Sequence, residues 1–382
     1  MPSFRLPSAW IGAVLGCLTI CAETAPKIAW IRLPVGAMQP ELASDRAGHL
    51  HAIWLSGPAG GSEVNYADLG VEGRLSPPPL PVNSQAGSAI AMGTIRGARL
   101  ALSARGTIHV IWNGSGTASP RPAKSSPLLY ARKLAGATGF EAQRNLIAAT
   151  ADLDGGGAVV ADGSETVHVF WHAGDGQGQT REDRRRVFES VSRDDGKTFD
   201  TEHPVDPGDG TGVCGCCGLR AGTDSKGRVF VIYRGAKDLV HRGTQLLEPA
   251  ADGTGFQRRL LQDWTSGACP MSLPALDSRS TGMHFAWETG GRLFGQATDA
   301  SEPTLLVSGP GARHPSMASN SRGETLLVWT EGTGWNRGGS LGWRLFDAQG
   351  KPTVTGGKRE DMPVWSYPAV ATRPDGSFVV AY

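Results

Sequence analysis

Apolar and polar positions along the chain follow a fifteen-residue pattern that recurs seven times, at intervals of 41 to 62 residues. A copy usually opens with a proline or small residue, has a turn glycine eight positions later, and ends on an aromatic residue. Two copies are imperfect, because one has Glu165 at the turn and another reaches Trp287 one residue early. The copies span residues 40–54, 98–112, 157–171, 219–233, 274–287, 315–329 and 368–382. Repetition at this period is typical of proteins built from repeated supersecondary units.

Each copy has the form of a β-hairpin. A short apolar stretch precedes a polar turn, and a β-branched run that ends on an aromatic follows it, as in residues 108–112. Third and fourth apolar segments come next, such as residues 128–131 and 304–307. Four antiparallel strands in roughly 40–60 residues are typical of a β-propeller blade. No long stretch of helical periodicity interrupts the pattern, so we expect an all-β propeller with few helices.

The number of blades depends on the two ends of the repeat. Six copies are followed by enough chain for four strands, whereas the seventh ends at Tyr382, on its second strand. The apolar segment at residues 28–33 precedes the first copy and can supply an outer strand to the last blade. This arrangement closes the ring with one strand missing, and it favours seven blades over six.

Composition excludes several classes of partner. The chain has 37 basic and 36 acidic side chains, 53 glycines and 25 prolines. A balanced charge gives no reason to expect nucleic acid or an acidic membrane surface as a partner. We therefore expect residues 27–382 to form a single turn-rich propeller, and no cofactor is indicated.

The first 22 residues resemble an export signal, with Arg5 followed by an apolar stretch at residues 9–20. Residues 14–17 resemble the lipobox of bacterial lipoproteins, in which Cys17 would carry the lipid and be the only attachment to a membrane. Cleavage after Ala22 would instead release a soluble protein. We expect a periplasmic, extracellular or lipid-anchored protein.

Four cysteines remain beyond the export signal. Cys214 and Cys269 each lie five residues before the start of a copy, so they occupy equivalent positions in adjacent blades, near the central channel. A disulfide between these blades suits an exported protein and leaves Cys216 and Cys217 as a vicinal pair or as free thiols. A thiolate site for zinc or Cu(I), made by all four cysteines, is the second interpretation, and a reactive thiol is the third.

A single motif points to a known family. Residues 192–199 fit the pattern Ser-x-Asp-x-Gly-x-Thr-Trp/Phe, in which the aspartate accepts backbone N–H groups across a turn and the glycine permits a positive φ. The motif resembles the Asp box, or BNR repeat, of the sialidase superfamily. That resemblance implies a glycoside hydrolase that removes terminal sialic acids. In this family three arginines bind the substrate carboxylate, a tyrosine activated by a glutamate is the nucleophile, and an aspartate is the acid/base.

The resemblance implies five site residues. Residues 31–34 resemble the N-terminal Phe/Tyr-Arg-Ile-Pro of sialidases, which makes Arg32 the first carboxylate arginine. Tyr367, immediately before a strand, is the candidate nucleophile and Glu288 is its candidate glutamate. Arg234 and Arg242 are candidates for the other two arginines. Propeller topology places Tyr367, Arg234, Glu288 and the cysteines on one face of the ring, and the Asp box on the other.

The acid/base residue is missing from this pattern. The early loop at residues 56–62 contains no aspartate, and Asp45 lies in a hairpin on the wrong face. Sialidases also have six blades, whereas the repeat of this chain favours seven. Two hypotheses follow: an exported exo-sialidase, or a non-catalytic envelope module that binds a glycan, a peptide or a metal at the channel face.

Overall fold

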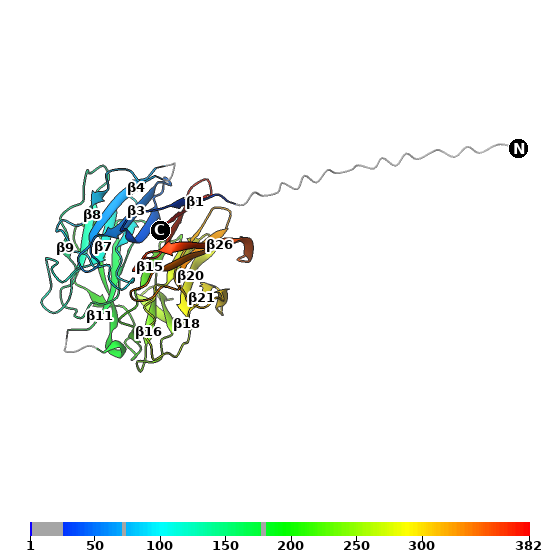
Figure 1. The fold of residues 1–382 in the computed structure, drawn as a ribbon. Coiled ribbons are helices and arrows are strands. Elements are labelled where there is room, and N and C mark those ends of the chain that lie inside the picture. Colours follow the sequence, from blue (N-terminus) through cyan, green and yellow to red (C-terminus); the bar gives the residue numbers. More distant parts are fainter. Residues whose placement is uncertain (2–25, 71–73, 177–180) are drawn as a thin grey trace.

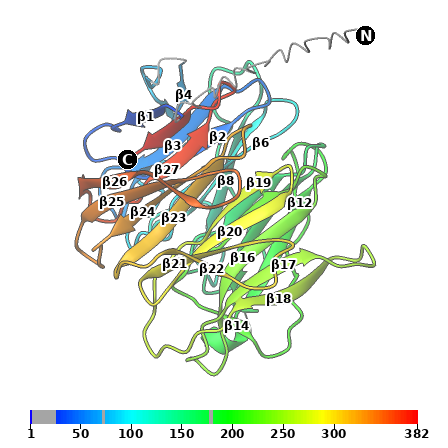
Figure 2. The ribbon, with the colours of Figure 1, turned by 90° about the vertical axis from the view of Figure 1, so that its right-hand side faces the viewer.

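Seven sheets, antiparallel except for one parallel strand pair, form a ring in the computed structural model (Figures 1 and 2). The model describes Met1 and residues 26–70, 74–176 and 181–382. Among these residues the only helical segment is a short 3-10 turn, η1 (Glu182–Arg184). The seven-bladed, all-β fold expected from the repeat is therefore confirmed.

Most blades contain four strands. Blade 1 is β2 (Met38–Ser44), β3 (Leu50–Ser56), β4 (Glu63–Leu69) and β5 (Leu80–Pro81); blade 2 is β6 (Arg99–Leu102), β7 (Ile108–Asn113), β8 (Leu128–Lys133) and β9 (Arg144–Asn145); blade 3 is β10 (Ala158–Ala161), β11 (Val167–Ala173), β12 (Arg186–Ser192) and β13 (His203–Pro204). Blade 5 is β19 (Ala275–Arg279), β20 (Gly282–Thr289), β21 (Arg292–Ala297) and β22 (Thr304–Val307); blade 6 is β23 (Ala312–Ser319), β24 (Thr325–Glu331), β25 (Gly339–Phe346) and β26 (Pro352–Met362).

Two blades depart from this plan. In blade 4, β14 (Gly212–Val213) and β15 (Arg220–Thr223) both pair with β16 (Val229–Ala236), which β17 (Thr244–Pro249) and β18 (Phe256–Gln262) follow. Blade 7 contains β27 (Ala369–Thr372) and β28 (Phe378–Ala381), and β1 (Ile28–Ile31) completes it. The predicted closure by the N-terminal segment is thus confirmed. Here β1 runs parallel to β28, with Ile31 opposite Ala381.

Apolar side chains from neighbouring blades pack against each other. Between blades 2 and 3, for example, Ile111 and Tyr130 share a core with Val169 and Phe188. The aromatic residue that ends most copies lies in these cores, and Trp112, Trp171 and Trp287 are almost fully buried. The fixed aromatic position of the repeat therefore marks the contact between blades.

The innermost strands β2, β6, β10, β15, β19, β23 and β27 contact their neighbours around the channel. We call the face that carries the loops leading into these strands the top face. The Asp box lies on the opposite face, where the Asp195 carboxylate accepts a hydrogen bond from Thr107 in the neighbouring hairpin (2.6 Å). Within the box, Asp194 accepts the backbone N–H of Thr198 (2.8 Å), and Gly196 has a φ of 77°. This geometry is the one expected for the turn.

The export signal, including Cys17 and Ala22, lies outside the described residues. In the described part of the chain, no helix has the length and apolar character needed to cross a bilayer.

The closure of the ring can be tested at the end of β1. Ile31 is buried in the core between blades 7 and 1, whereas its neighbour Arg32 is exposed. We expect Ile31→Ala to lower the free energy of unfolding by about 2 kcal/mol or more, since it leaves a cavity. Arg32→Ala, a surface change, is expected to stay within about 0.5 kcal/mol. Urea unfolding measures both, and equal effects would contradict closure by β1.

Candidate functional site

Unusual backbone conformations gather in the loops of the top face. Six non-glycine residues with φ between 48° and 65° lie at or just before the innermost strands of six blades: Gln39, Thr94, Asp152, Met271, His314 and Trp365. Such conformations persist only where the surrounding structure fixes them, and they often mark functional sites. The corresponding loop of blade 4 carries three cysteines instead. The top face is therefore the first place to look for a site.

Ile95 closes the mouth of the channel on this face. Its side chain is fully buried and clusters with Leu273 and Tyr367. A Cβ added at Gly156 or Gly218 would collide with the Ile95 backbone oxygen, so the chain of blades 3 and 4 approaches this loop closely. The centre of the face is thus packed with protein rather than open.

Tyr367 packs against Ile95, which we call the plug of the channel. Its side chain is 2% exposed, and its hydroxyl oxygen accepts a hydrogen bond from Arg99 (2.7 Å). Arg99 also pairs with Glu41 (3.0 Å), and Glu41 pairs with Arg220. Burial raises the pKa of Glu41, but the charges of Arg220 and Arg99 outweigh this effect and the net shift is downward. A cavity of about 150 Å³ in the channel is lined in part by Glu41 and Arg220.

The repeat contains the signal for these channel charges, although the sequence analysis missed it. Glu41, Arg99 and Arg220 each directly follow the first residue of a copy, in blades 1, 2 and 4. That position faces the channel in the folded ring. A charge there, where other copies have alanine or serine, predicts an ion pair across the channel.

Arg234, Glu288 and Arg242 come together between blades 4 and 5. Arg234 donates hydrogen bonds to the backbone oxygens of Arg242 (2.9 Å) and Glu288, and its guanidinium is 3.8 Å from the Glu288 carboxylate. Arg234 also stacks over Trp264, 5.1 Å from the ring centre. Arg234 and Glu288 are 5% and 2% exposed. This group forms a buried contact between blades, with its hydrogen-bonding capacity largely used internally.

The five residues proposed from the resemblance therefore occupy three places. Arg234, Arg242 and Glu288 form one group, and Tyr367 lies with Arg99 under the plug. Arg32 is exposed after β1, the outer strand of blade 7. No hydrogen bond or ion pair among the described residues joins Arg32 or Tyr367 directly to the Arg234 group.

The cysteines form the densest cluster of reactive groups on the top face. A disulfide joins Cys216 to Cys269, while Cys214 and Cys217 are free and buried. The expected bridge between blades 4 and 5 is therefore present, but its partner in blade 4 is Cys216 rather than Cys214. Cys214 points inward, where Arg242 donates a hydrogen bond to its sulfur (3.1 Å). Side-chain direction, which the sequence spacing does not reveal, decides the pairing.

Charged groups surround the two free thiols. Arg242 also pairs with Glu182 (2.8 Å), whose other oxygen accepts the backbone N–H of Gly215 (2.8 Å). The hydrogen bond to Cys217, together with burial, raises the pKa of Cys214. Burial acts to raise the pKa of Cys217 too, but the hydrogen bond from Cys214 and the charge of Arg234 lower it overall. The pKa values of the two free thiols are therefore shifted in opposite directions, upward at Cys214 and downward at Cys217.

His172 supports this cluster from blade 3. Its Nε2 is 2.8 Å from the Cys217 backbone oxygen, and Arg185 donates to its Nδ1 (3.2 Å). The neutral ring with its hydrogen on Nε2 satisfies both contacts. Burial, followed by the charge of Arg185, lowers the pKa of His172 to about 3.

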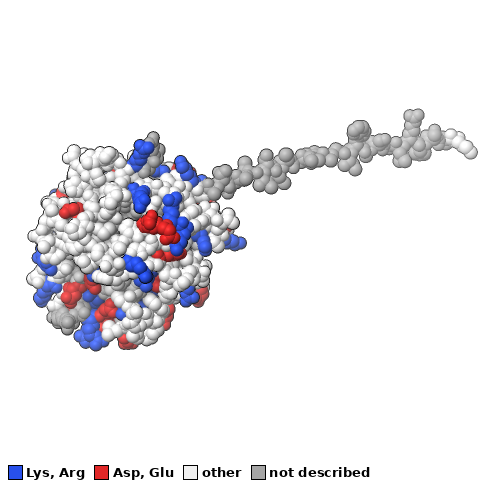
Figure 3. Space-filling view, in the orientation of Figure 1, with Lys and Arg blue, Asp and Glu red and all other residues white. Residues whose placement is uncertain are grey.

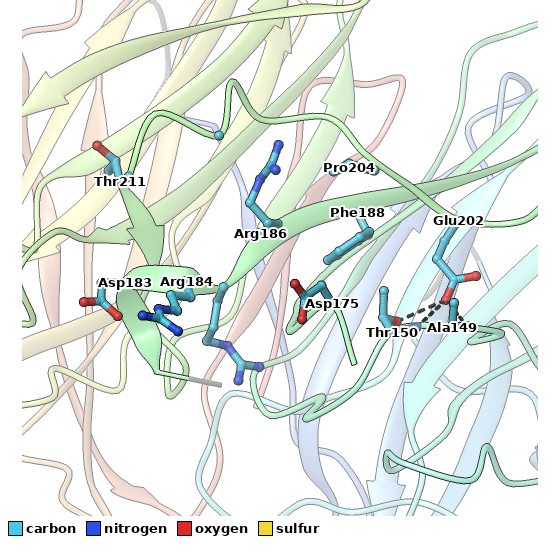
Figure 4. Close-up of a pocket in the computed structure, with 13 residues that line it drawn as sticks. Ala149, Thr150, Asp175, Asp183, Arg184, Arg186, Phe188, Glu202, Pro204 and Thr211 are labelled. Carbon is cyan, nitrogen blue, oxygen red and sulfur yellow. Dashed lines mark hydrogen bonds between the residues drawn. The ribbon is translucent and has the colours of Figure 1, made fainter. Parts of the chain in front are cut away.

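A larger hollow lies beside the cluster, between blades 3 and 4. It has a volume of about 520 Å³, and Figure 4 shows the Arg184, Arg186 and Glu202 side chains around it. Several of its charges have partners, because Arg186 pairs with Asp206 and Glu202 accepts backbone N–H groups from residues 148–150. On the face of the molecule in Figure 3, basic and acidic side chains are interspersed, so no field of one sign covers that face.

The burial of His172 makes stability depend on pH. The unfolded chain, in which histidine has a pKa near 6.5, binds more protons than the folded chain between about pH 6.5 and 3. Stability therefore falls as the pH decreases through this range. We expect His172→Gln, which retains a donor and an acceptor, to reduce the loss of stability between pH 7 and 5 by about 2 kcal/mol. Urea titrations at both pH values measure this, and an unchanged loss would rule out His172 as a source.

Comparisons with known proteins support the fold alone. No protein-family model matches the chain, and no curated protein matches its sequence. Hadza microbial sialidase Hz136 is similar in structure, with a TM-score of 0.52 and 14% identity over 87% of this chain and 76% of that one. A protein of unknown function from Dyadobacter fermentans has a TM-score of 0.54 and 12% identity, over 89% and 99% of the two chains. The BP39L lectin from Burkholderia pseudomallei has a TM-score of 0.52 and 11% identity, over 90% and 95%. At these identities, the chain is shown to share a β-propeller fold with proteins of different activities.

Proposed function

We propose that this protein is an exported β-propeller that binds a carbohydrate on its top face, with Trp335 as the stacking platform. The observation that carries the proposal is the exposure of this indole. Trp335 is 53% exposed, whereas Trp112, Trp171 and Trp287 are almost fully buried. It lies between β24 and β25, in a loop on the same face as Ile95.

The surroundings of Trp335 suit a sugar. A Cβ added at Gly93 would lie 3.1 Å from the indole and 2.9 Å from Arg96, so Trp335 of blade 6 reaches the loop that leads into blade 2. A small hollow next to it is lined in part by Arg313, Thr94 and Thr333. Guanidinium and hydroxyl groups can bind sugar hydroxyls or a carboxylate, while the C–H face of a pyranose packs on the aromatic ring.

Two further features support a carbohydrate ligand. The sialidase and the lectin with similar structures act on or bind sugars by name, and both share this architecture. The Asp-box turn at residues 192–199 resembles that of the sialidase superfamily. Export through the N-terminal segment would place the top face outside the cytoplasm, where cell-surface glycans occur.

Hydrolysis of sialosides is the second candidate function. One observation favours it: Tyr367 contacts Arg99, which pairs with Glu41, so a tyrosine, arginines and a carboxylate do meet in the channel. The arginines differ from those that the resemblance implied. A substrate would reach Tyr367 only after the loop around Ile95 moves.

Carbohydrate binding can be tested with a glycan array followed by calorimetry on the strongest hit. We expect Trp335→Ala to weaken binding at least ten-fold, because an exposed aromatic platform contributes more than about 1.4 kcal/mol. Leu260→Ala is the matched control, since Leu260 is equally exposed but lies on β18, the outer strand of blade 4. Equal binding by both variants, or no glycan ligand at all, would contradict the proposal.

The catalytic alternative has its own test, hydrolysis of a fluorogenic sialoside. We expect no turnover by the intact protein, since the Tyr367 hydroxyl is buried and bonded to Arg99. Turnover that Tyr367→Phe abolishes would instead establish a sialidase and place its nucleophile. A tyrosine at this position would then act as in the glycosidases that depart from a carboxylate pair.

A further inference from the structure

The four cysteines form two pairs of different accessibility. The Cys216–Cys269 disulfide lies on the outer side, with Cys269 exposed and Cys216 half-buried. Behind it, Cys214 and Cys217 are 0% and 2% exposed. The Sγ atoms of Cys214 and Cys216 are 3.6 Å apart, which is van der Waals contact. A buried thiol therefore touches an accessible disulfide.

Two features prepare the buried pair for thiol chemistry. Cys214 and Cys217 have the Cys-x-x-Cys spacing, and a turn brings them together, with the Cys217 N–H bonded to the Cys214 oxygen (3.2 Å). Arg242 donates a hydrogen bond to the Cys214 sulfur, and Glu182 holds Arg242 in place. The hydrogen bond to Cys217 and burial raise the pKa of Cys214 overall, and the charge of Arg242 acts in the opposite direction. The thiolate is the nucleophile in disulfide exchange.

We propose that these cysteines form a thiol–disulfide exchange site. In it, the buried Cys214–Cys217 dithiol transfers two electrons to the Cys216–Cys269 disulfide and presents a reduced thiol at Cys269. The substrate is a disulfide on a molecule outside the protein that reaches Cys269. The exchange site is independent of the carbohydrate-binding proposal.

The chemistry balances within the cluster. The Cys214 thiol loses its proton to water, and the Cys214 thiolate attacks the Cys216 sulfur. The bond to Cys269 breaks, and Cys269 leaves as a thiolate that takes a proton from water. Cys217 loses its proton to water and attacks Cys214, which releases Cys216 as a thiolate that takes a proton from water. One disulfide and two thiols are present before and after, and the external disulfide then reoxidises Cys216 and Cys269.

The test is alkylation of the folded full-length protein by a maleimide, without added reductant. If the Cys214–Cys217 dithiol reduces the Cys216–Cys269 disulfide, the maleimide labels Cys269. Peptide mapping then finds a disulfide between Cys214 and Cys217. Cys214→Ser keeps the Cys216–Cys269 disulfide but removes the attacking thiol, so its labelling at Cys269 should be at least ten-fold slower. In the matched variant Cys217→Ser, Cys269 should still be labelled. Exchange should end after its first step in this variant, with a disulfide between Cys214 and Cys216.

Three results would overturn the proposal. The first is that Cys269 of the wild-type protein is not labelled. The second is that Cys269 is labelled at the same rate in Cys214→Ser as in the wild type. The third is that the purified protein holds a metal ion bound by four reduced cysteines. If Cys214→Ser fails to fold, Arg242→Gln replaces it, because this change keeps every cysteine. Its labelling at Cys269 should be slower than that of the wild type, and an unchanged rate would count against the role of the Cys214 thiolate.

Discussion

Closure of the ring by β1 and β28 is the constraint on which the rest of the structure depends. Each blade exposes an apolar face on either side unless a neighbour covers it, so an open ring would leave two such faces in water. Seven full copies of the repeat leave the last blade short of strands. The segment before the first copy fills that place, and Ile31 then packs in the core between blades 7 and 1. The closed ring fixes where every loop of the top face lies.

Closure also brings charges together in a narrow channel. Glu41, Arg99 and Arg220 come from three blades, and each would be costly to bury alone. Glu41 pairs with both arginines, and Tyr367 accepts a hydrogen bond from Arg99, whose Nε and Nη2 are left without partners among the described residues. Ile95 packs with Leu273 and Tyr367 on the top face, and a cavity of about 150 Å³ remains beside Glu41 and Arg220. Trp335 and Cys269 of this face are exposed to solvent, unlike the buried residues Ile95 and Tyr367.

Blade 4 differs most from the common plan. Its additional strand β14 precedes the loop that carries Cys214, Cys216 and Cys217, whereas each of the other six blades has a non-glycine residue with positive φ in the equivalent region. Buried arginines from the same blade face the sulfurs of this loop. Negative charge on a sulfur can persist there despite burial, because a cation accompanies it. A departure from the repeat thus coincides with thiols whose pKa values are shifted by buried charges.

The sequence by itself determined the fold to a large extent. Period, turn glycines and closing aromatics predict seven blades, since these features follow from local backbone conformation and from burial between units. The sequence also predicted that residues 28–33 belong to the last blade, because only that blade lacked strands. The Asp-box turn followed from side-chain chemistry within eight residues.

Only the tertiary structure decided which side chains meet at the site. Cys214 and Cys216 are two residues apart, yet one points inward to Arg242 and the other bonds to Cys269. Tyr367 and Glu288 were expected in one pocket, but the loop around Ile95 and the contact between blades 4 and 5 hold them in different places. Sequence spacing fixes the blade and the face of a residue. The direction of its side chain depends on packing against blades that are distant in the sequence, and this packing exists only in the closed ring.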